Sequence, residues 1–134
     1  MTTIDKKQTI AILKNSLINK TELMFSFLHG SFLDSAYFHD IDIAVYVDET
    51  MVPKEKTMDY EFDLSDELED VVKRHVDVKV MNYAPLAFQY HATAGKILTC
   101  SDEELMADKV ADIRIFYLDF KPTSRQTVME MLGV

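Results

Sequence analysis

The sequence predicts an α/β (α+β) fold in which a small mixed β-sheet is flanked by helices. Apolar residues alternate with polar ones in short segments such as DIDIAVYVD and VDVKVM, and they recur every three or four residues in the longer segments between them. Strand and helix patterns therefore take turns along the chain, which favours one sheet covered by helices. The chain has 134 residues, 48% of them hydrophobic, and no linker, so residues 1–134 are expected to form one domain.

The first third of the chain predicts one helix and two strands. Residues 5–19 predict a helix, because their apolar side chains fall on one face. The run LMFSFL, which ends at His29, predicts a strand, and Gly30 with Ser31 predicts the turn after it. The segment DIDIAVYVD predicts a second strand, whose apolar face is opposite a face that carries Asp40, Asp42, Ala44 and Tyr46.

The middle of the chain predicts a connection, a helix and a third strand. MVPKEKTMDYEF is polar and contains Pro53, so we expect an exposed connection there. A helix is expected over about 64–75, starting after Asp63 and ending near His75. VDVKVM then predicts a third strand with Asp77 and Lys79 on one face.

The remaining segments predict two helices and a fourth strand. Residues 84–93 fit a short helix that stops at Gly95, and KILTC fits a strand. SDEEL begins a long helix that Pro122 is expected to end. The apolar stripe of this helix includes Phe116 and Tyr117, which suit either the core or a contact with a partner or a second copy.

Charge and cysteine content limit the possible functions. The net charge of −9 comes from 23 acidic and 14 basic residues, and it would repel a nucleic-acid backbone, so direct nucleic-acid binding is not expected. Charged and polar residues interrupt the apolar positions of the N-terminal segment, so neither a signal peptide nor a membrane span is expected. A single cysteine, Cys100, predicts no disulfide framework and favours the cytoplasm.

The two aspartates of DIDIAVYVD predict a metal site. Asp40 and Asp42 share one strand face, where their carboxylates could converge on Mg²⁺, and Asp77 is the best candidate for a third acid. Two metal ions held there could clamp a nucleoside triphosphate, with Gly30 and Ser31 next to its phosphates. A simpler interpretation stays open, because a solvated strand face in a chain with 23 acidic residues would show the same alternation.

The combination of these elements resembles a known family. Gly30-Ser31 followed by Asp40-Ile41-Asp42 is similar to the Gly-Ser and D-x-D elements of the minimal nucleotidyltransferase (MNT) domains of the polymerase-beta-type superfamily, found as antitoxins beside HEPN-domain toxins. The likeness continues through VDVKVMNYAPLAFQYHATAGKIL and YLDFKP, and thus covers nearly the whole chain. It implies a polymerase-beta-like nucleotidyltransferase fold.

The resemblance also implies an activity and the residues that perform it. Such domains transfer a nucleotide, most often AMP from ATP, to a protein; in toxin pairs the acceptor is a tyrosine hydroxyl of the HEPN ribonuclease, which is thereby silenced. By resemblance, Asp40, Asp42 and Asp77 would hold two Mg²⁺ ions, Gly30 and Ser31 would hold the triphosphate of ATP, and Asp77 would lie near the incoming hydroxyl. The resemblance implies a HEPN toxin as the partner. The chain would form either a hetero-oligomer with that toxin or a homodimer.

Some residues depart from the family pattern. The loop FLDSAYFH is short and carries Asp34 where relatives commonly have Arg or Gly, and His39 next to Asp40 fits either a phosphate contact or an ordinary exposed loop. Two alternatives therefore remain: a non-catalytic binding module that neutralises its partner by occlusion, and an enzyme acting on a small molecule such as an aminoglycoside. The second alternative usually requires an additional substrate-binding domain.

Overall fold

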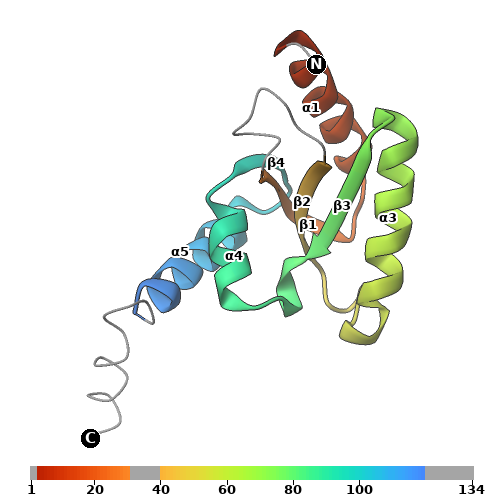
Figure 1. Cartoon of the computed structure of the whole chain (residues 1–134). Coiled ribbons are helices and arrows are strands. Elements are labelled where there is room, and N and C mark those ends of the chain that lie inside the picture. Colours follow the sequence, from red (N-terminus) through yellow and green to blue (C-terminus); the bar gives the residue numbers. More distant parts are fainter. Residues whose placement is uncertain (1–2, 31–39, 120–134) are drawn as a thin grey trace, which may run out of the picture.

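A computed structural model describes residues 3–30 and 40–119 of the chain (Figure 1). The order of elements is α1 (Thr3–Leu17), β1 (Leu23–His29), β2 (Asp40–Val47), α3 (Thr57–Val72), β3 (His75–Val80), α4 (Leu86–Thr93), β4 (Lys96–Cys100) and α5 (Glu103–Asp119), with 3-10 turns at Lys54–Lys56 and Met81–Tyr83. The predicted α/β (α+β) class is confirmed. None of the helices within these ranges has the length and apolar character needed to cross a membrane.

The strands form one mixed sheet in the order β3-β2-β1-β4. β1 pairs antiparallel with both of its neighbours, whereas β2 and β3 are parallel, with α3 as the crossover between them. In the described part of the chain β3 and β4 are therefore the two edges of the sheet, and β2 lies inside it.

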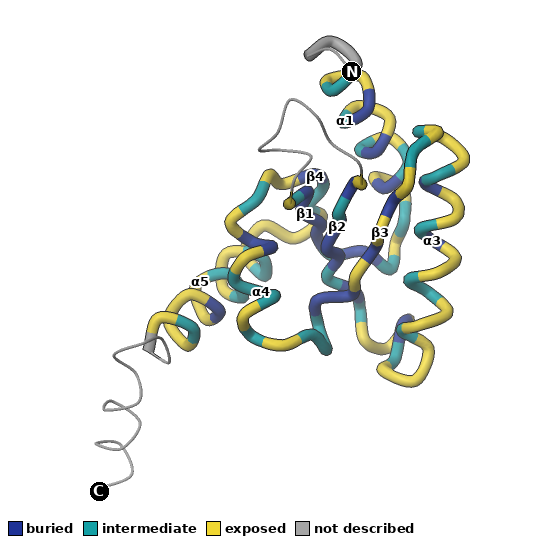
Figure 2. Tube along the Cα trace, in the orientation of Figure 1, coloured by how far each residue is buried: buried dark blue, intermediate teal, exposed yellow. Residues whose placement is uncertain are grey.

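Helices cover both faces of the sheet. On one face, Ile41 and Ile43 of β2 are fully buried against Leu13 of α1 and Leu68 of α3. On the other face, Ala44 and Tyr46 of β2 and Phe25 of β1 pack with Ala92 of α4 and Ile113 of α5, and the Phe25 and Tyr46 rings stack with centroids 4.7 Å apart. Figure 2 shows the resulting buried layer between the two pairs of helices. The face of β2 that carries Asp40 and Asp42 is thus covered by α4 and α5 in the second half of the strand, at Ala44 and Tyr46.

Helix α3 corrects two predictions. It begins at Thr57, within the segment predicted as an exposed connection, and it ends at Val72, before His75. Polar contacts to other parts of the chain hold the first turns of α3, so these turns show no apolar stripe in the sequence. The Tyr60 hydroxyl, for example, donates a 2.7 Å hydrogen bond to Glu22. At the other end, Lys73 adopts a left-handed conformation with φ of 57°, which turns the chain into β3. His75 is the first residue of that strand.

The same helix satisfies the free edge of β3. Glu61, Ser65 and Glu69 lie one turn apart along α3 and accept hydrogen bonds from outward-facing N–H groups of the strand, those of Val80 at 2.7 Å, Val78 at 3.0 Å and Val76 at 3.1 Å. Unpaired N–H groups on an edge strand would otherwise attract another strand. The contacts fix α3 to the sheet and block these groups.

The elements from β3 onward match the prediction, and Asn82, the first residue of the Asn-Tyr-Ala-Pro stretch at 82–85, has a structural role. The third and fourth strands and the helices over Leu86–Thr93 and Glu103–Asp119 are confirmed, while Pro122 lies outside the described residues. The Asn82 side chain accepts a 2.9 Å hydrogen bond from the N–H of Val47 and donates one of 2.8 Å to the Val47 carbonyl oxygen. Asn82 thus replaces a strand partner at the end of β2.

We expect Asn82→Ala to lower the free energy of unfolding by about 1–3 kcal/mol, because it leaves two partly buried backbone groups without a partner. Urea unfolding at neutral pH measures the change. Asn82→Asp keeps the acceptor and loses the donor, so it should fall between Ala and the native residue. Equal stabilities for native and Asn82→Ala would contradict this role.

Candidate functional site

The polar residues His29, Asp42 and Asp77 form a row across three neighbouring strands at one end of the sheet. In the strand register, His29 of β1 pairs with Asp42 of β2, and Asp42 pairs with Asp77 of β3. Asp40 lies two residues before Asp42 on the same face, at the start of β2, where it pairs with His75. The structure therefore brings Asp40, Asp42 and Asp77 together at one end of the sheet, as the sequence predicted.

Gly30 lies against the central aspartate of this row. It follows β1 directly and has φ of 82°, a conformation that side chains rarely adopt. A Cβ atom at this position would overlap the Oδ2 atom of Asp42. Glycine is thus required here both for the turn and for the close approach of the Asp42 carboxylate. The adjacent site prediction, Ser31, lies outside the described residues, as do Asp34 and His39.

Burial and like charge act together on Asp42. Desolvation is the largest cause that raises the pKa of this carboxyl group, and Asp77 and Asp40 raise it further, whereas the nearby His29 and His75 lower it. The pKa of His29 is lowered, because its burial outweighs the attraction of Asp42 and Asp77. The folded chain therefore disfavours the ionised form of Asp42, and a cation beside it would offset the repulsion from the nearby carboxylates.

His29 is the residue of the row that the sequence analysis did not single out. Its ring packs edge-on against Phe88 of α4, with centroids 5.4 Å apart, so the two elements fix its position. The sequence carried one signal: His29 immediately precedes Gly30 at the end of an apolar strand. Its position beside Asp42, however, depends on strand pairing, which the sequence alone does not determine.

The donor chemistry of the row fits Mg²⁺. Carboxylate oxygens are the ligands that Mg²⁺ prefers, and the ion usually binds through one or two of them together with water and substrate phosphates. Within residues 3–30 and 40–119, no group of three or more His, Cys, Asp or Glu side chains is arranged to hold a metal ion by itself. Any metal ion held by Asp40, Asp42 and Asp77 would therefore need further ligands, such as water or a phosphate group.

Comparison with known proteins identifies the group of proteins to which this site belongs. A family model described as "Polymerase beta, Nucleotidyltransferase" matches residues 11–104, a span that contains Gly30 and all three aspartates. No curated protein sequence matches the chain.

Several solved structures share the fold. One is the toxin-antitoxin MntA-HepT, with 17% identity over 98% of both chains and a TM-score of 0.59. A second is a tri-AMPylated Shewanella oneidensis HEPN toxin in complex with MNT antitoxin, with 18% identity over 100% of both chains and a TM-score of 0.60. A third is a toxin-antitoxin with AMP-PNP, with 18% identity over 96% of this chain and 98% of that one, and a TM-score of 0.62.

We expect Gly30→Ala to cost more stability than its backbone conformation explains. The left-handed conformation alone costs about 1–2 kcal/mol, and the overlap with Asp42 adds to it. In an Asp42→Ala background the overlap disappears, so a double-mutant cycle by urea unfolding should give a coupling free energy of about 1 kcal/mol or more. The same cost of Gly30→Ala in both backgrounds would refute the close approach.

Asp42→Asn should change how stability depends on pH. Since the folded pKa of Asp42 is above its ordinary value of 3.8, the native chain holds this proton more tightly than the unfolded chain does. The contribution of Asp42 to stability is therefore complete below pH 3.8 and is lost as pH rises through the folded pKa. In EDTA, the stability of Asp42→Asn relative to native should rise with pH across this window.

Asp48→Asn provides a control of opposite sign. Hydrogen bonds from the Thr50 side chain and backbone lower the pKa of Asp48, so this carboxylate contributes stability above its ordinary pKa and loses that contribution as pH falls. Relative to native, Asp48→Asn should become less stable as pH rises. Urea unfolding between pH 3 and pH 7 compares the two variants, and parallel trends would contradict the assignment.

Proposed function

The chain belongs to the polymerase beta nucleotidyltransferase family, and from that premise we propose that it is a Mg²⁺-dependent protein adenylyltransferase. It transfers AMP from ATP to a tyrosine hydroxyl of a HEPN-domain ribonuclease toxin and thereby acts as the antitoxin of that toxin. The proposal takes residues 1–134 as one MNT domain and places it in the cytoplasm, where ATP is available.

The row of acids carries this proposal. Asp42 and Asp77 are paired in register on adjacent parallel strands, Asp40 follows the same face, and Gly30 leaves space beside them. Burial, together with the nearby Asp77 and Asp40 carboxylates, raises the pKa of Asp42, so a bound cation would favour its ionised form.

The chemistry follows from the placement of these groups. Mg²⁺, when bound by Asp40, Asp42 and Asp77 as two ions, would neutralise the triphosphate charge of ATP. Gly30 and Ser31 would adjoin the phosphates. The acceptor oxygen forms a bond to the α-phosphorus as the bond from that phosphorus to the bridging oxygen breaks, and pyrophosphate leaves. Asp77, on the edge strand β3, would lie near the acceptor hydroxyl and take its proton.

A protein acceptor fits this chain better than RNA does. The net charge of −9 repels nucleic acid and suits a basic protein surface. The similar structures include a tri-AMPylated HEPN toxin in complex with MNT antitoxin and a toxin-antitoxin with AMP-PNP, which supports ATP as the nucleotide donor and a HEPN protein as the partner.

Transfer of label from α-labelled ATP to a co-expressed protein encoded beside this chain, expected to be a HEPN-domain protein, tests the proposal. With Mg²⁺, we expect label to enter the partner with the native chain and to fall by at least about 100-fold with Asp40→Asn/Asp42→Asn, because the metal ligands are lost. EDTA should abolish transfer, and a Tyr→Phe change at the labelled acceptor residue should remove the site of modification.

The outcomes separate the two functional classes. Label that depends on the aspartates identifies an enzyme. No label with either version, together with a stable complex formed by both, would overturn catalysis and leave a module that neutralises its partner by occlusion. Neither label nor complex would reject the HEPN partner altogether.

A further inference from the structure

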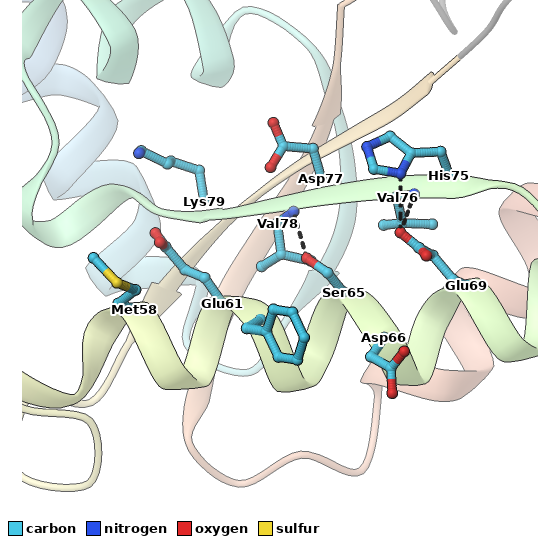
Figure 3. A pocket seen from close by; sticks show the side chains of 11 residues that line it. Met58, Glu61, Ser65, Asp66, Glu69, His75, Val76, Asp77, Val78 and Lys79 are labelled. Carbon is cyan, nitrogen blue, oxygen red and sulfur yellow. Dashed lines mark hydrogen bonds and ion pairs between the residues drawn. The ribbon is translucent and has the colours of Figure 1, made fainter.

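An open groove of about 480 Å³ runs between α3 and the free edge of β3. Figure 3 shows Glu61, Ser65 and Glu69 reaching from α3 toward the strand, where Glu69 lies 3.1 Å from Nδ1 of His75, while Asp77 and Lys79 project from the strand on the side away from α3. Asp77 therefore belongs both to this groove and to the acidic row of the candidate site. Asp77 is thus the residue through which the groove adjoins the candidate site.

Two large apolar side chains of α3 line the groove and are exposed to solvent. Met58 is 79% exposed and Phe62 is 73% exposed. Residues four apart lie on the same side of a helix, so the two side chains form one patch. Side chains of this kind are common anchors at protein interfaces.

The charge of the groove specifies what can cover that patch. Four of its lining residues are acidic, namely Glu61, Asp66, Glu69 and Asp77, whereas one, Lys79, is a permanent cation. A cationic segment would be attracted to this surface, and an acidic or nucleic-acid ligand would be repelled.

The hydrogen bonds along the edge constrain the shape of the occupant. The N–H groups of Val76, Val78 and Val80 are already bound to Glu69, Ser65 and Glu61, so these donors are not available to an added β-strand. The occupant must therefore bind mainly through side chains, as a helix or a loop does.

We propose that this groove binds the segment of the protein acceptor that carries the hydroxyl, and that this segment is basic with apolar anchors for Met58 and Phe62. The inference rests on the proposed function, because Asp77 is the link between the groove and the reaction. It adds a docking surface, distinct from the nucleotide-binding residues, that selects the acceptor.

Two groove variants with matched controls test the proposal. Met58→Ala/Phe62→Ala removes the apolar patch, and Asp66→Lys reverses an exposed charge that makes no contact needed for the fold. Met51→Ala changes an exposed methionine outside the groove, and Asp70→Lys changes an exposed aspartate of the same helix that does not line it. Far-UV circular dichroism and urea unfolding confirm that all four variants fold.

The readouts are the Kd of the complex with the neighbouring HEPN-domain protein, the KM for that protein in AMP transfer, and the KM for ATP. We expect each groove variant to raise the Kd and the acceptor KM at least about 10-fold with an unchanged KM for ATP, and each control to change them less than about 2-fold. Asp66→Lys should also weaken the dependence of the Kd on salt.

The results distinguish failure of the groove from failure of the reaction. Groove variants that bind and modify the acceptor like the native chain overturn the docking surface while leaving the transferase intact. Loss of binding without any transfer by the native chain supports the groove and rejects catalysis. A native dimer that Met58→Ala/Phe62→Ala converts to a monomer in analytical ultracentrifugation, with acceptor binding unchanged, would assign the groove to a second copy of this chain.

Discussion

The parallel pairing of β2 with β3 is the constraint on which the candidate site depends. It sets Asp42 in register with Asp77, and a slip of one residue would send one of the two side chains to the opposite face. The register is fixed by apolar residues of both strands that are buried beneath α1 and α3, and by the three hydrogen bonds that α3 makes to the edge of β3. Hydrophobic burial thus holds two like charges together that would otherwise separate.

Much of this arrangement could be predicted from the sequence because it follows from period-two alternation. In β2 and β3 the alternation identified which residues share a face, so Asp40, Asp42 and Asp77 were correctly expected on the polar faces of their strands, and the register sets Asp42 beside Asp77. Alternation is reliable here because one face of each strand lies against the core. The family resemblance is confirmed by the polymerase beta model, whose match spans these same residues.

The features that could not be predicted depend on contacts between distant segments. The first turns of α3 lack an apolar stripe, since they are held by the Tyr60 contact to Glu22 and by Glu61 at the edge of β3. His29 became part of the site only through the antiparallel register of β1 with β2. Asn82 likewise looked like a family marker, whereas the structure gives it the role of a backbone substitute at the end of β2.

Folding stability and cation binding favour opposite protonation states of Asp42, at the end of the sheet that carries the aspartates. Burial raises the pKa of Asp42, so the ionised form needed to bind a cation is the form that the folded chain favours less. Gly30 relieves part of the crowding, since a Cβ atom there would overlap the Asp42 carboxylate. The groove beside α3 carries no such conflict, because its acidic side chains are solvated or bound to backbone N–H groups. Replacement of Asp42, which does not line the groove, would therefore stabilise the fold and, on the proposed function, remove a metal ligand while leaving the docking surface intact.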